Sequence, residues 1–139
     1  MRAAIQRRLA TEESGFTMLE LLVVMIIMAN LIAIAVPAYL TIKTKAQQQA
    51  AKANVRDGAP AVLAYGSDNT GTASDIDANA STTGYAGMTL ALLQTYDGRV
   101  KNIRIQSTST STFCIDSTVG TYTYKKAGPY ADIVSGACP

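Results

Sequence analysis

Residues 16–36 read FTMLELLVVMIIMANLIAIAV, a nearly unbroken apolar run that dominates the architecture of this chain. Its only polar residues are Thr17, Glu20 and Asn30. As an α-helix the run would be about 31 Å long, which is enough to cross the hydrocarbon core of a membrane. The alternative is a buried core helix, but core helices are usually shorter or carry a polar stripe, and the rest of the chain is too small to enclose a rod that is apolar all round. We therefore expect a membrane-spanning helix.

The charges ahead of the run indicate its orientation. Arg2, Arg7 and Arg8 precede it, and a basic flank favours the cytoplasmic side of a membrane. We therefore expect the precursor in the inner membrane, with the chain after the run outside the cytoplasm. Both cysteines, Cys114 and Cys138, lie in this exported part, where a disulfide can persist. A cross-link between them should stabilise the fold by about 3 kcal/mol.

A cleaved secretion signal is the competing interpretation of the same segment. Val36-Pro37-Ala38 could serve as the small-residue cleavage site that ends such a signal. However, the apolar run is longer than the usual signal core of about 7–15 residues, and Glu20 lies near its start. A carboxylate at membrane depth costs a few kcal/mol, so we expect another group to compensate Glu20.

The residues from Ser14 to Leu22, SGFTMLELL, resemble the processing signature of type IV prepilins and the related pseudopilins. That signature is a short basic leader that ends in glycine, then phenylalanine, then glutamate four residues later; here these are Gly15, Phe16 and Glu20. A proline 21 residues after the phenylalanine is also common in the family, and Pro37 occupies that place. The resemblance covers the leader and about the first third of the chain, and it is specific because all these positions keep register.

The resemblance implies that a membrane-embedded prepilin peptidase cuts after Gly15 and methylates the new amino group of Phe16. Removal of residues 1–15 takes away three arginines and two glutamates, which leaves nine basic and eight acidic side chains. The carboxylate of Glu20 can then neutralise the new α-amino cation of the same or a neighbouring subunit. The alternative is that Glu20 lies at headgroup depth and reaches water.

The sequence after the run predicts that one long helix continues through Pro37 with a bend, because proline removes a backbone hydrogen bond. Residues 39–66 are rich in helix-favouring alanine, glutamine and lysine. We expect Gly58 and Pro60 to weaken the helix, a final turn or two to run through Ala64, and Gly66 with Asp68-Asn69 to end it. A repeat at helical spacing can reflect either a face for close packing or helix propensity alone. Its members are Ile42, Ala46, Ala50 and Ala53.

Residues 67–87 are predicted to form a loop, because they are mostly Gly, Ser, Thr, Asn and Asp. Asp75, Asp77 and Asn79 stand at alternate positions, as at the start of a calcium-binding loop. However, alanines stand where that loop needs its glycine and its final glutamate. Turn formation is the better interpretation, and we expect no metal or cofactor site.

The remaining chain is predicted to form a short helix followed by strands. Residues 88–97 predict a helix that starts from Thr89 as its N-cap and stops at Gly98. Apolar and polar residues alternate in three later segments, as expected for strands of a small antiparallel sheet. These segments are Val100–Gln106, Thr112–Asp116 and Thr121–Lys125.

The composition argues against an enzyme. The chain has no histidine and only two cysteines, which excludes histidine-based acid–base chemistry and a four-ligand Cys/His zinc site. Its formal net charge is +2, too small to indicate nucleic acid as a partner. The scattered aspartates are interpreted as solvated turn residues. They are Asp68, Asp75, Asp77, Asp97 and Asp116.

We expect an α+β protein in which a long N-terminal hydrophobic helix, bent near Pro37, packs against a small antiparallel sheet. The expected regions are a leader (1–15), a membrane and filament-core segment (16–38), an outer half of the helix (39–66) and a head (67–139). The resemblance implies the major pilin of a type IV pilus-like surface filament, a helical homopolymer built by machinery with a cytoplasmic ATPase. A pseudopilin of a type II secretion system is the alternative within the family. An exported or membrane-anchored binding protein is the alternative outside it.

Overall fold

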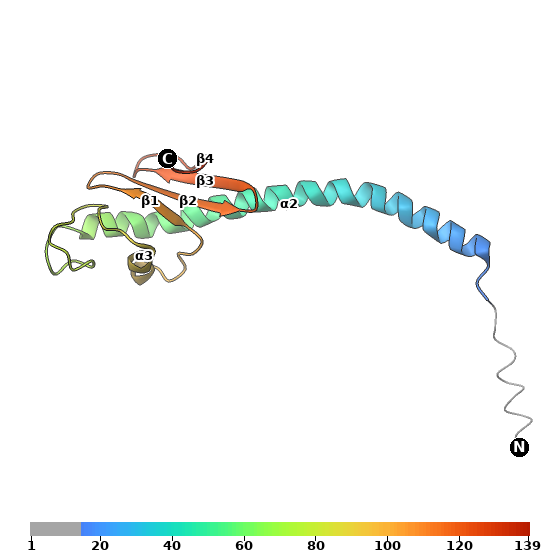
Figure 1. Cartoon of the computed structure of the whole chain (residues 1–139), viewed down its shortest axis with the longest axis horizontal. Helices are drawn as coiled ribbons and strands as arrows, with labels where there is room; N and C mark the ends of the chain where they lie inside the picture. Colours follow the sequence, from blue (N-terminus) through green and yellow to red (C-terminus); the bar gives the residue numbers. More distant parts are fainter. Residues whose placement is uncertain (1–14) are drawn as a thin grey trace, which may run out of the picture. The chain divides into compact units, whose positions relative to one another are not determined.

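The protein is described by a computed structural model for residues 15–139, so the basic leader residues Arg2, Arg7 and Arg8 lie outside the described part. An antiparallel sheet with strand order β1-β2-β3-β4 packs on one long helix, which confirms the expected α+β arrangement (Figure 1). The elements are α2 (Met18–Asp68), α3 (Leu90–Tyr96), β1 (Arg104–Thr108), β2 (Phe113–Val119), β3 (Tyr122–Ala127) and β4 (Val134–Ser135).

Helix α2 is continuous over 51 residues and passes through Pro37 without interruption. The bend expected at Pro37 stays a prediction. Helix α2 is also unbroken at Gly58 and Pro60, and it ends at Asp68, within the expected stop signal of Gly66 with Asp68-Asn69. Both glycines lie where a neighbouring side chain comes close to the helix, so packing outweighs their low helix propensity.

The chain divides inside α2 into two compact units, which we describe separately. The apolar segment, residues 16–41, contains the first half of the helix, and every one of its residues is exposed. The head unit, Ile42–Pro139, contains the second half of the helix, α3 and the sheet. The two units therefore receive their stability from different sources, since only the head unit has a core of its own.

The core of the head unit lies between the second half of α2, α3 and the sheet. The stripe of Ile42, Ala46, Ala50 and Ala53 is exposed, so it does not pack on this core. The buried stripe of α2 lies on another face and again follows a spacing of three and four residues. Its members are Ala51, Val55, Gly58, Val62 and Tyr65, with Ala61 beside them.

Strand β2 is buried on both faces. Phe113 and Ile115 point into the core with Val55 and Tyr65 of α2, whereas Cys114 and Asp116 alternate with them on the opposite face. Five consecutive residues of β2, from Phe113, are buried. The C-terminal segment covers the outer face, because Cys138 is tied to Cys114 by a disulfide.

The smaller elements agree in kind with the sequence predictions and differ in extent. Thr89 is the N-cap of α3, as expected, and its hydroxyl accepts the N–H of Leu92 at 3.3 Å. Strand β1 begins at Arg104 rather than Val100, because Val100 and Ile103 fill the core from a connecting loop. The two-residue strand β4 was not predicted, since Val134 and Ser135 carry no alternation long enough to recognise.

Candidate assembly site

Gly15 and Phe16 lie in an exposed, non-helical stretch immediately ahead of α2. No other part of the described chain comes within 4 Å of the position that a Cβ on Gly15 would occupy. The Phe16 side chain is 78% exposed. The peptide bond between these residues is therefore open to an enzyme that needs an extended substrate.

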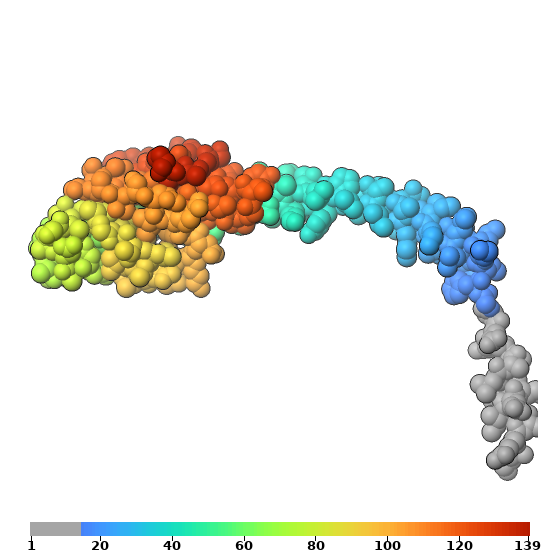
Figure 2. Space-filling view, in the orientation of Figure 1, coloured from blue at the N-terminus to red at the C-terminus, as the bar shows by residue number. Residues whose placement is uncertain are grey.

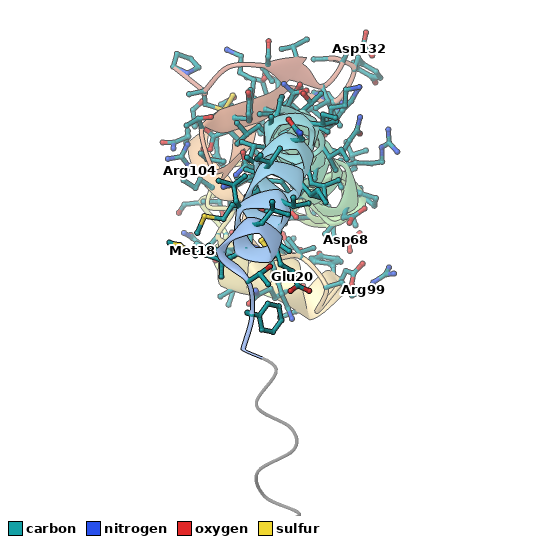
Figure 3. All side chains as sticks on the ribbon, turned by 90° about the vertical axis from the view of Figure 1, so that its right-hand side faces the viewer. Met18, Glu20, Asp68, Arg99, Arg104 and Asp132 are labelled. Atoms are coloured by element: carbon teal, nitrogen blue, oxygen red, sulfur yellow. A yellow bond between two sulfur atoms is a disulfide. The ribbon has the colours of Figure 1, made fainter. Side chains whose placement is uncertain are left out.

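Glu20 lies in the first turn of α2 (Figure 3). Its backbone N–H donates to the hydroxyl of Thr17 at 3.2 Å, so Thr17 closes the amino end of the helix. The carboxylate of Glu20 forms no ion pair with any residue of the range 15–139. The helix dipole favours a negative charge here, but a full counter-charge would have to come from a new amino terminus or a neighbouring chain.

The apolar segment presents large side chains on every side of the helix. Met18, Leu19 and Ile34 are 93%, 73% and 75% exposed. The helix is long and apolar enough to cross a membrane, and none of its most apolar stretch is buried within the chain. A surface of this kind requires lipid or other protein around it, because apolar area left in water costs about 25 cal/mol per Å².

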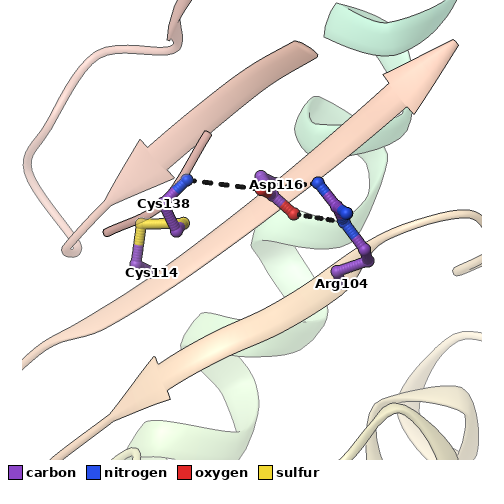
Figure 4. The surroundings of a disulfide bond; sticks show 4 residues. All are labelled: Arg104, Cys114, Asp116 and Cys138. Atoms are coloured by element: carbon purple, nitrogen blue, oxygen red, sulfur yellow. Dashed lines mark hydrogen bonds and ion pairs between the residues drawn. A yellow bond between two sulfur atoms is a disulfide. The ribbon is translucent and has the colours of Figure 1, made fainter. Parts of the chain in front are cut away.

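The disulfide between Cys114 and Cys138 confirms the predicted pairing, with an S–S distance of 1.98 Å and a Cα–Cα distance of 5.9 Å (Figure 4). Beside it lies Asp116, whose side chain is fully buried. Arg104 donates to both carboxylate oxygens, through Nε at 2.9 Å and a terminal nitrogen at 3.0 Å. The backbone N–H of Cys138 donates to the same carboxylate at 3.3 Å.

The interpretation of Asp116 as a solvated turn residue is therefore wrong. Asp116 stands two residues after Cys114 in a strand, so both point to the same face, and Arg104 is its partner across β1 and β2. A search for opposite charges on paired strands could have found this ion pair. Its role is structural, since it holds the C-terminal segment on the outer face of β2.

Asp75 and Asp77 organise the loop after α2, as the turn interpretation predicted. One oxygen of Asp75 accepts the backbone N–H groups of Thr70, Gly71 and Thr72, at 2.8, 2.7 and 2.8 Å. Hydrogen bonds from Thr72, and further ones from Thr70, lower the pKa of Asp75 to about 2. The carboxylate thus serves as an anchor for the loop backbone.

Asp77 connects the same loop to the core. It accepts the hydroxyl of Thr82, which lowers its pKa, and the hydroxyl of Tyr65 at 3.2 Å. Burial, followed by this hydrogen bond, raises the pKa of Tyr65 to about 12. Within the part of the chain that the structure describes, no three Asp, Glu, His or Cys side chains come together as a metal-binding group.

The predicted site residues thus fall in two places. Phe16, Glu20 and Pro37 lie along the apolar segment with Gly15 directly ahead of it, and the cysteines lie in the head unit. The first group offers an exposed peptide bond, a carboxylate without an ion pair in the range 15–139, and an uncovered apolar surface; the second offers a disulfide-bonded fold. Comparisons with family models, curated proteins and solved structures find no match to this chain.

Proposed function

We propose that this chain is the major structural subunit of a type IV pilus-like filament on the cell surface. The observation that carries the proposal is the uncovered apolar segment with Glu20 in its first turn, joined to a folded and disulfide-bonded head unit. Such a segment has to be covered by lipid before assembly and by the same segment of other subunits afterwards. The head units would form the outside of the filament.

Processing of the amino terminus would prepare the apolar segment to leave the lipid and pack against neighbouring subunits. Cleavage by a prepilin peptidase between Gly15 and Phe16 would create an α-amino cation four residues ahead of Glu20. The carboxylate of Glu20 could then pair with the amino group of an adjacent subunit inside an apolar bundle, where an unpaired charge is costly. A contact that joins one surface of a subunit to a different surface of the next subunit is heterologous. When repetition of this contact does not close a ring, it generates an open filament. A cytoplasmic assembly ATPase would supply the work of extraction.

The direct test is the amino terminus of the protein isolated from its native host. A start at N-methylated Phe16, in material sheared from surface filaments seen by electron microscopy, supports the proposal. A start at Tyr39 would indicate ordinary secretion, and an intact Met1 would indicate a plain membrane anchor. Correct processing without surface filaments would favour a secretion pseudopilin instead.

Glu20→Gln tests the role of the carboxylate, because it keeps the shape of the side chain and removes its charge. We expect cleavage after Gly15 to proceed and filament yield to fall at least about tenfold, as expected when a desolvated amino cation loses its partner. The ratio of mature to precursor protein, measured by mass spectrometry of membranes, serves as the internal control. Normal filament yield in this variant would show that the carboxylate is dispensable.

A further inference from the structure

The charges of the chain are segregated by sign along the sequence. Between Glu20 and Asp57 every charged residue is basic, and between Arg56 and Arg99 every one is acidic. The basic group is Lys43, Lys45, Lys52 and Arg56. The acidic group is Asp57, Asp68, Asp75, Asp77 and Asp97. Asp57 and Asp97 lie beside Arg56 and Arg99, so the negative surface of the head unit is formed by the other three aspartates.

The positive surface of the head unit, around Lys52 and Arg56, contains a groove. A groove of about 570 Å³ lies between α2 and the connection from β3 to β4. Lys52, Arg56 and Lys126 line it, with Asp132 as the one carboxylate among them. The ammonium of Lys126 donates to the carbonyl oxygens of Pro129, at 3.1 Å, and Ala131, which fixes its position. Neither Lys52 nor Arg56 is in an ion pair with another residue of the described range. We call this the basic groove.

The negative surface is the acidic loop, residues 68–79, at the carboxyl end of α2. It forms the end of the head unit in the space-filling view, where it appears yellow-green (Figure 2). The last turn of α2 carries no basic residue, so the negative end of the helix dipole adds to the charges of Asp68, Asp75 and Asp77. Burial, then a hydrogen bond and the charge of Asp68, raise the pKa of Tyr96 to about 12, as expected beside a negative surface.

The two surfaces cannot neutralise each other within one chain. Twelve residues of α2 separate Arg56 from Asp68, which corresponds to about 18 Å along the helix axis. Exposed charges are largely screened beyond about 8 Å at physiological ionic strength. Asp68 and Asp132, one from each surface, also lie well apart in Figure 3.

We propose that the acidic loop of one copy docks in the basic groove of a second copy. The inference rests on the proposed function and names the contact between head units that would accompany packing of the apolar segments. Its partner is fixed by charge complementarity, since the groove carries three cations and one carboxylate and the loop carries three carboxylates and no cation. Because the groove and the loop are different surfaces, each copy can join two neighbours, and the contact propagates.

Charge reversal tests the contact in the full chain, assembled in its host. Lys52→Glu with Arg56→Glu should reduce filament yield at least about fivefold, because like charges then face each other. Asp68→Lys should reduce it in the same way, and the combination of all three changes should recover most of the yield. Lys101→Glu, an equal change of charge on an exposed residue outside the groove, should leave the yield unchanged. Thermal unfolding of each variant identifies any that fails to fold, and Lys52→Gln then replaces the double reversal.

Zero-length carbodiimide cross-linking supplies a second readout. It joins an amine to a carboxylate only when the two are in contact, so a link between Lys52 and Asp68 has to come from two copies. We expect such a link in intact filaments and its loss in the Asp68→Lys variant. Wild-type filaments without this link, together with unaffected reversal variants, would overturn the docking contact and leave the proposed function standing. A wild-type chain that forms no filaments at all would overturn the proposed function itself.

Discussion

The two halves of α2 are one helix in two surroundings. In the first half every residue is exposed, and even Val24, the least exposed of its large apolar side chains, has 42% of its surface uncovered. In the second half a narrow stripe is fully covered by the head unit, and Val55 has no exposed surface. The covered half is the more polar one, with six charged residues against one, so hydrophobicity alone does not say which half has a core of its own. The difference lies in the residues that follow far along the sequence and fold back on one half only.

The comparison is tested most strongly by one substitution made in each half. Val55→Asp buries an unpaired charge and should destabilise the head unit by more than about 4 kcal/mol, enough to unfold most of it. Val24→Asp should leave the head unit intact and instead weaken membrane retention and filament formation. Near-ultraviolet circular dichroism of the tyrosines, in detergent, reports the fold of the head unit. An unfolded Val24→Asp head unit would show that the two halves are not independent.

The ion pair on the outer face of β2 should have the next largest effect. Arg104→Ala leaves the buried carboxylate of Asp116 with only the N–H of Cys138, and should cost about 2–4 kcal/mol of unfolding free energy. Asp116→Asn should cost less, because Arg104 is half exposed and can turn to water. Urea titrations of both variants measure the difference. Equal losses would contradict this asymmetry.

Gly66→Ala reverses the usual effect of that exchange. Alanine in a helix is ordinarily more stable than glycine by about 1 kcal/mol, but a Cβ on Gly66 would overlap the ring of Tyr85. Tyr85 packs on Phe113 with ring centroids 4.8 Å apart, so its ring cannot move without loss. We expect a loss of about 1–3 kcal/mol. Gly98→Ala is the control, because no atom lies near the corresponding position there. A Gly66→Ala protein as stable as the parent would show that the ring moves freely.

The smallest effect concerns the pH dependence of the loop after α2. The folded pKa of Asp75, about 2, lies below its ordinary value of 3.8. Its contribution to stability is therefore complete above about pH 4 and is lost as the pH falls through about 2. Thr72→Ala should raise this pKa toward the ordinary value, because the largest contribution comes from the Thr72 hydroxyl. Carboxyl NMR titration measures the shift, and Thr95→Ala, elsewhere in the head unit, should leave it unchanged.

The sequence was sufficient for features that depend on local chemistry. The apolar run predicted the start and character of α2, Thr89 marked the N-cap of α3, and the two cysteines form the expected disulfide. Each of these follows from residue type and spacing within a short window. The α+β fold class followed from them, because the long helix uses so much of the chain that the remaining residues can form only a small sheet.

Features set by distant partners were not predictable in the same way. The buried stripe through Val55 and Tyr65 was missed, because alanines are distributed around this half of the helix and mask its amphipathic period. The packing of the Tyr85 ring against Gly66 was also missed, because Tyr85 comes from the loop after the helix. Asp116 was predicted at the end of a strand but grouped with the solvated aspartates, because its partner, Arg104, belongs to another strand. Processing at Gly15 and pairing of Glu20 stay predictions that the protein itself has to test.

If the chain is exported as we propose, the C-terminal segment over β2 sets an order for its maturation. Cys138 follows Cys114 by 24 residues, so β2 leaves the membrane before the segment that covers its outer face. Until then Cys114 stays accessible to an oxidoreductase and Asp116 lacks one of its donors. The disulfide can close only after translocation has delivered Cys138. A closed bond would then mark a chain whose translocation is complete, and a truncated or stalled chain would be recognisable by its free thiol.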